Sequence, residues 1–214
     1  MLKKIKKYLS NSSFFKSKSK KIEDTFDQLV LEVTTSNKVL IWPAFGTLLG
    51  IYRDNGFISH DNDVDFAAWY NDRTLVRNYL ESKECILVRK FLSDSIQFAY
   101  EEQYEKNGVK FDVFYFVKDN DVVYTHDFMR YKDLTRSKTT KLLGGLIVRR
   151  LHISINRIVR FEYKGVDINF PENVTEHLAQ RYGDDFMTPN PNWTAQKENP
   201  YVQELVNDGK LVKV

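Results

Sequence analysis

The feature that most constrains this chain is a run in which aspartates occupy every second position just before an apolar segment. Asp61, Asp63 and Asp65 are each separated by one residue, while Val64 and Phe66 occupy the alternate positions. Because successive side chains of a β-strand point to opposite faces, this spacing puts the carboxylates on one face and the apolar side chains on the other. The run therefore predicts a buried strand over residues 64–69 that begins at a group of carboxylates.

Carboxylates this close together repel one another unless a cation lies between them. Hard oxygen ligands select Mg²⁺ or Mn²⁺, and these ions in turn bind phosphate oxygens. The alternative interpretation is a polar loop that leads into a strand, with its acidic side chains simply solvated.

Two neighbouring features favour the metal interpretation. Upstream, Gly46 and Thr47 form a glycine–hydroxyl pair at the predicted start of a helix, where backbone N–H groups can face a phosphate. Downstream, Asp112 is an isolated acid in an otherwise apolar strand predicted over residues 109–117. A lone buried Asp is costly unless it is paired or bound to a metal. Together these features supply the parts of a two-metal phosphoryl-transfer site.

These residues also carry a family resemblance. Residues 45–65, with the sequence FGTLLGIYRDNGFISHDNDVD, resemble the signature of the LicD/fukutin family. The resemblance is close over residues 42–69, resumes at Asp112, and returns over residues 170–189, where a predicted helix ends at Tyr182 and Gly183. It implies an α+β fold of the nucleotidyltransferase type, with a mixed β-sheet flanked by helices.

The function implied by the resemblance is transfer of a phospho-alcohol, such as phosphocholine or phosphoribitol, from a CDP-activated donor to a sugar. Bacterial members of the family modify lipopolysaccharide, capsule or teichoic acid. Ser59 and His60 replace the Pro-Trp pair common in bacterial members and are closer to the fukutin branch. The resemblance therefore leaves the donor alcohol open.

Carried over by position, the resemblance implies a role for each residue of the motif. The residues that match the donor-phosphate site are Gly46, Thr47 and Arg53. The predicted ligands of Mg²⁺ or Mn²⁺ are Asp61, Asp63, Asp65 and Asp112. The predicted catalytic residues are Asp63, Asp65, Asp112 and His60.

Two of these residues have open alternatives. Arg53 can clamp the donor diphosphate, or it can pair with Asp54 or Asp61. His60 can accept the proton of the acceptor hydroxyl as a general base, or it can support Asp61.

Other function classes remain to be weighed. A true nucleotidyltransferase would use the same aspartates to attach NMP from an NTP to a small molecule or a protein. A binding module without activity is a third class, against which intact Asp63, Asp65 and Asp112 argue. Nucleic-acid binding is not expected, because the arginines lack interleaved aromatic residues and the net charge is only +3.

The chain of 214 residues suits one domain, and we find no repeat or internal boundary. Residues 1–21 are rich in lysine and contain no acid, which predicts a basic flexible arm before a single nucleotidyltransferase-like catalytic domain over residues 22–214. The lone Cys85 excludes an internal disulfide and fits a reducing compartment. No apolar run approaches the roughly 20 residues that span a bilayer. A cytoplasmic protein is therefore expected.

Residues 141–160 show apolar side chains at helical spacing, with four arginines between them, at 149, 150, 157 and 160. The pattern predicts a basic amphipathic helix. Such a helix either packs on the sheet with its arginines in water or touches an anionic membrane, where a lipid-linked glycan acceptor would reside. The residues after Gly183 are expected to be irregular but folded back onto the domain.

Overall fold

The structure is a computed structural model, and it describes residues 22–59, 61, 63–195 and 198–214. The predicted basic arm over residues 1–21 lies outside the described residues. Among the helices of the described part, none is both long and apolar enough to cross a membrane.

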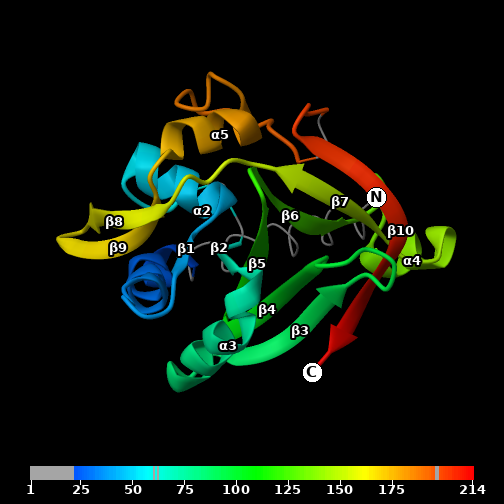
Figure 1. The fold of residues 1–214 in the computed structure, drawn as a ribbon, viewed down its shortest axis with the longest axis horizontal. Coiled ribbons are helices and arrows are strands. Elements are labelled where there is room, and N and C mark those ends of the chain that lie inside the picture. Colours follow the sequence, from blue (N-terminus) through cyan, green and yellow to red (C-terminus); the bar gives the residue numbers. More distant parts are fainter. Residues whose placement is uncertain (1–21, 60, 62, 196–197) are drawn as a thin grey trace, which may run out of the picture.

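The fold is α+β, as predicted, and its centre is a mixed sheet (Figure 1). Within the described residues the sheet has eight strands in the order β1-β2-β5-β4-β3-β10-β7-β6. Their bounds are β1 Ile41–Pro43, β2 Asp65–Trp69, β3 Ile86–Leu92, β4 Tyr100–Lys106, β5 Val109–Asp119, β6 Val122–Met129, β7 Leu146–His152 and β10 Val202–Lys213. Strands β2 and β5 run parallel, and the other pairs are antiparallel.

The long strand β5 changes partners along its length. Its first part lies between β4 and β2, and its last residues, Val117 to Asp119, pair with β6. This second pairing joins the two ends of the series β5-β4-β3-β10-β7-β6 into a closed ring, from which β2 and β1 branch. One face of β2, β5 and β4, the open face, carries Asp65, Asp112 and Glu101 and borders a cavity.

Helices cover the opposite face of these strands. Residues 22–34 are helical, and α3 (Arg73–Ser82) follows a short 3₁₀ turn, η2 (Tyr70–Asp72). Val30, Val76 and Leu80 from these helices join Phe66 and Phe111 of the sheet in one core. Every second residue of β2 and β5 is therefore held in this core, and the residues between point to the other face.

The remaining helices lie near the open face. Helix α2 (Phe45–Leu49) continues directly into a π-helical turn, η1 (Gly50–Asp54), and α5 (Val174–Tyr182) packs beside α2 (Figure 1). Helix α4 (Arg136–Leu143) leads into β7, and the hairpin β8 (Ile158–Tyr163) and β9 (Val166–Pro171) precedes α5.

Two expectations about elements are wrong. Residues 141–160 do not form a helix, because α4 ends at Leu143 and the chain then forms β7 and β8. The tail is not irregular throughout, since β10 fills the ring between β3 and β7.

The arginines of the 141–160 segment therefore do not form a basic face. Arg149 is buried and paired with Asp127, whereas Arg150 stacks on Tyr124. Arg157 pairs with Glu172, and Arg160 donates to Asn169. The structural basis for the predicted membrane contact of this segment is absent.

Candidate active site

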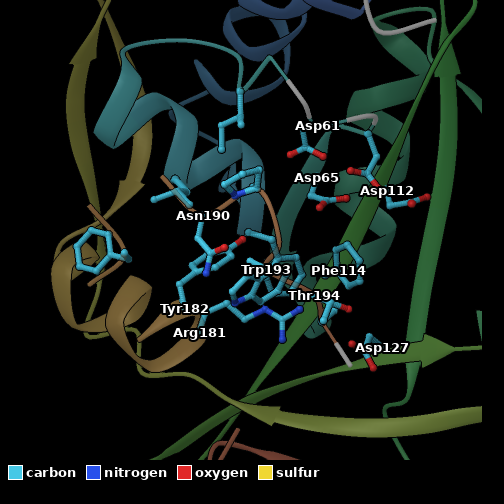
Figure 2. A pocket seen from close by; sticks show the side chains of 18 of the residues that line it. Asp61, Asp65, Asp112, Phe114, Asp127, Arg181, Tyr182, Asn190, Trp193 and Thr194 are labelled. Atoms are coloured by element: carbon cyan, nitrogen blue, oxygen red, sulfur yellow. The ribbon is translucent and has the colours of Figure 1, made fainter. Parts of the chain in front are cut away.

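A cavity of 490 Å³ lies on the open face of β2, β5 and β4 (Figure 2). Its other walls include α2, α5 and the segment 185–195. It is lined by many charged side chains. The acidic ones are Asp61, Asp63, Asp65, Glu101, Asp112, Asp127 and Asp185, and the basic ones are Arg53, Arg136 and Arg181. All four predicted metal ligands thus share one cavity.

The topology brings two of these aspartates together. Asp65 and Asp112 are in register on the parallel strands β2 and β5, so their carboxylates leave the same face of strands about 4.8 Å apart. Gln103 of β4 continues the row and donates from Nε2 to Oδ1 of Asp112 at 2.8 Å. Asp61 and Asp63 reach the same cavity from the loop before β2, because β2 begins only at Asp65.

The negative charges of these aspartates are only partly offset by neighbouring groups of the protein. Burial raises the pKa of Asp65 well above its ordinary value, and the charges of Asp63 and Asp112 raise it further. Burial also raises the pKa of Asp112 to about 6, although the hydrogen bond from Gln103 acts in the opposite direction. A bound cation would reverse both effects, since it favours the charged form of a neighbouring carboxylate.

Glu101 is a further acid of the cavity that the sequence did not single out. It lies in β4 opposite Phe114, is 5% exposed, and faces the cavity beside Asp112. Burial raises its pKa well above the ordinary value, and Asp112 contributes in the same direction. In the sequence Glu101 belongs to the polar run YEEQYEK. Acids occupy both faces of a strand with this sequence, so the alternation of side chains does not show which acid faces the site.

Gly46 lies at the edge of the cavity, in the first turn of α2. A Cβ atom at this position would overlap Oδ2 of Asp61. The missing side chain therefore lets the Asp61 carboxylate lie against the backbone of α2, next to the place predicted for phosphate.

Thr47 has a different position from the one predicted. It is 3% exposed and does not line the cavity. Its Oγ1 accepts a hydrogen bond of 2.9 Å from the backbone N–H of Asp65. Thr47 therefore fixes the first residue of β2, and its contribution to the site is to hold Asp65 in place.

Arg53 lines the cavity but is already paired. Its Nε and Nη2 donate to the two carboxylate oxygens of Asp54 at 2.8 and 2.7 Å, and Nη1 donates to the carbonyl of Phe186 at 3.3 Å. Of the two alternatives left open by the sequence, the structure contains the pair with Asp54. His60 lies outside the described residues, and its predicted role stays a prediction.

The donor chemistry of the cavity fits a hard divalent cation, since Asp61, Asp63, Asp65 and Asp112 offer only carboxylate oxygens. In the described part of the chain, no three Asp, Glu, His or Cys side chains already stand as a metal site. Cation binding would thus require these side chains to turn toward one another within the cavity.

Comparison with known protein families identifies the domain that contains this cavity wall. The sequence model described as "LicD/FKTN/FKRP, nucleotidyltransferase domain" matches residues 38–143. The chain carries a LicD-family domain. The matched segment contains the cavity aspartates and Glu101, whereas Arg181, Tyr182 and Trp193 line the same cavity from outside the LicD match.

Curated relatives agree with the LicD assignment. The ribitol-5-phosphate transferase FKTN of Homo sapiens is 26% identical over 180 residues, which cover 82% of this chain and 36% of that protein. FKTN of Mus musculus is 24% identical over 179 residues, with 82% and 35% covered. The chain therefore spans about a third of the length of the curated relatives it matches.

Among solved structures, the lincomycin-bound lincosamide antibiotic adenylyltransferase LnuA matches with a TM-score of 0.35 and 12% identity, covering 71% of this chain and 76% of that chain. This likeness is too weak to support an argument about the LicD-family chain.

Proposed function

We propose that this chain is a divalent-cation-dependent transferase that moves a phospho-alcohol from a CDP-activated donor onto a sugar hydroxyl of a glycan. One observation carries the proposal. The LicD segment brings Asp63, Asp65 and Asp112 to one wall of a 490 Å³ cavity, where the raised pKa values of Asp65 and Asp112 mark charge that the protein leaves uncompensated. Such a wall suits a ligand that arrives with a cation, and a nucleoside diphosphate ester is of that kind.

In the proposed reaction, the acceptor hydroxyl oxygen forms a bond to the phosphorus that carries the alcohol. The bond from that phosphorus to the oxygen of CMP breaks, and CMP leaves with the electron pair. The hydroxyl proton passes to a carboxylate of the cavity. Atoms and charge balance without any oxidant or further co-reactant.

Asp63, Asp65 and Asp112, with Asp61 beside them, would hold Mg²⁺ or Mn²⁺, which when bound supplies positive charge to the phosphate oxygens. The chain's own residues position the parts. Gly46 leaves the backbone of α2 open beside Asp61, and Thr47 anchors the start of β2.

The names of the matched relatives guide the choice of alcohol. The matched relatives are named ribitol-5-phosphate transferases, which supports CDP-ribitol as the first donor to test. CDP-choline and CDP-glycerol are the next candidates. The acceptor is proposed to be a surface glycan, free or lipid-linked, and the cytoplasmic location stays a prediction.

The decisive experiment incubates the protein and Mg²⁺ with each CDP-alcohol and a glycan acceptor, and in parallel with CTP or ATP. The proposal expects CMP release that depends on the acceptor, together with an alcohol phosphate on the glycan. Asp65→Asn should abolish this product. Release of pyrophosphate from CTP or ATP, with a nucleotide on the acceptor, would instead establish the nucleotidyltransferase alternative.

A further inference from the structure

Arg181 is a buried cation in the cavity wall; it lies outside the LicD match, and although it falls within the 170–189 stretch of the family resemblance, that resemblance assigns it no role. It belongs to α5 and is 8% exposed. Its guanidinium carbon lies 5.1 Å from the ring centre of Phe45 and 5.0 Å from that of Trp193, so the group packs over two aromatic faces. Trp193 is itself held by Tyr182, with ring centres 4.7 Å apart.

The guanidinium of Arg181 has no anionic partner among the described residues. No ion pair or hydrogen bond joins it to another side chain of that part, and its buried Nε has no hydrogen-bond partner. The other arginines near the cavity differ. Arg53 is paired with Asp54, Arg149 is paired with Asp127, and Arg136 is exposed to water.

A buried guanidinium without a counter-charge is costly, and two aromatic faces offset only part of that cost. The contacts with the two rings restrict the guanidinium, and none of its N–H groups has a side-chain partner among the described residues, so they are available to a ligand. Figure 2 shows Arg181 and Trp193 on one side of the pocket, and Asp61, Asp65 and Asp112 on the other. The cavity therefore has a carboxylate wall and, across from it, an oriented cation.

We propose that Arg181 binds the phosphate oxygens of a nucleoside diphosphate ester, with Phe45 and Trp193 holding the guanidinium in position. This inference rests on the proposed function for the identity of the donor, but its ligand chemistry is that of a diphosphate. A planar fork of N–H donors suits such oxygens, whereas a lysine would offer only a point charge. A diphosphate between the two walls meets a cation held by the carboxylates on one side and Arg181 on the other.

Calorimetric titration of the whole chain in Mg²⁺ tests the inference with three probes: CDP, inorganic pyrophosphate and cytidine. Arg181→Met keeps an unbranched side chain about as long as the aliphatic stem of arginine but removes the guanidinium, and should weaken CDP and pyrophosphate binding by about 10- to 100-fold, the range expected for a charged hydrogen bond. Cytidine, which has no phosphate, should bind wild type and variant alike. Arg157→Gln, at an exposed arginine far from the cavity walls, serves as the matched control and should change nothing.

Arg181→Lys guards against a variant that fails to fold, because it keeps the charge and should lose only part of the affinity for CDP and pyrophosphate. The inference is overturned if wild type binds neither phosphate probe, or if folded Arg181→Met and Arg181→Lys bind pyrophosphate as wild type does. Equal loss of cytidine and pyrophosphate would also overturn it, since it would mark a collapsed cavity. The transfer assay tests the proposed function separately. If diphosphate binding depends on Arg181 but no phospho-alcohol is transferred, the proposed function is refuted and the inference about Arg181 still holds.

Discussion

Two neighbouring glutamates of β4 are buried on opposite faces of one sheet, and the protein treats them in opposite ways. Glu102 points into the helix-covered face and is fully buried. Its oxygens accept hydrogen bonds from the side chains of Tyr100, Tyr104, Tyr115 and Arg77. Glu101 points into the cavity, where the nearest charges include further acids, and burial raises its pKa well above the ordinary value.

The difference separates a structural charge from a functional one. Around Glu102 each oxygen has donors, and the Arg77 guanidinium supplies the counter-charge, so the network is complete within the chain. Glu101 is buried and Asp65 and Asp112 are half-buried, and although Arg136 and Gln103 offset part of the effect, the pKa of each of the three acids stays raised. A fold that keeps several acids in that state has lower stability without a ligand, which is typical of a binding site.

The largest expected effect is on the free energy of unfolding, and a matched pair of isosteric substitutions at the two glutamates measures it. Glu102→Gln removes the charge that Arg77 and three tyrosine hydroxyls require, and should lower the free energy of unfolding by about 3 kcal/mol. Glu101→Gln removes an uncompensated charge and should leave that free energy unchanged or raise it. Urea denaturation at pH 7 with a chelator present measures both. Equal destabilisation by the two variants would contradict the distinction between the two faces.

A second, smaller effect concerns pH. The folded-state pKa of Asp112 is raised from 3.8 to about 6, so the stability associated with its protonated form is present below pH 4 and is lost as pH rises through about 6. In a chelator, wild type should therefore lose stability over this window. Asp112→Asn removes the titrating group, should lose less stability across the same window, and should exceed wild type at pH 7 by about 2 kcal/mol. If the free energy of unfolding changes equally with pH in the two proteins, the charge of Asp112 is compensated in wild type and the account is contradicted.

The smallest effect tests a residue that lies close to the cavity and yet has a structural role. Thr47→Val deletes the hydroxyl that accepts from the Asp65 N–H and should cost about 1 kcal/mol or slightly more. Thr47→Ser keeps the hydroxyl and should restore most of that loss. Thermal unfolding distinguishes the two variants. If valine were neutral for stability but reduced donor binding, Thr47 would belong to the phosphate site as the motif first indicated.

The sequence predicted the parts of the molecule whose signals are local. Alternating aspartates, the apolar strand around Asp112 and the helix ending at Gly183 are each contained in a few consecutive residues, and all are present. Alternation along a strand also predicted the face of Asp65 and Asp112, whereas Asp61 and Asp63 lie in the loop before β2 and reach the cavity from outside any strand.

The error over residues 141–160 has a geometric cause. Residues four apart share a face in a strand as well as in a helix, so Ile147 and Leu151 fit both patterns. Arg149 decides between them: in β7 it lies on the same face as Ile147 and Leu151, where it meets Asp127 from β6. That partner is 22 residues away, and no local pattern indicates it.

Glu101, Arg181 and β10 were missed for the same reason. Glu101 becomes a cavity residue only because β4 pairs with β5, and Arg181 only because α5 packs against α2. Strand β10 is a polar stretch that is fixed by β3 and β7, which lie far from it in the sequence. Each of these features depends on a contact between distant segments.

The central claim is that the cavity carboxylates await a divalent cation, and thermal unfolding with added Mn²⁺ or Mg²⁺ tests it most directly. Wild type should gain thermal stability saturably as the cation is added, since a ligand of the folded state stabilises it by mass action. Asp65→Asn should start from a higher melting temperature in chelator and gain much less, and KCl at equal ionic strength should not reproduce the wild-type gain. Identical shifts for wild type and Asp65→Asn would contradict the account.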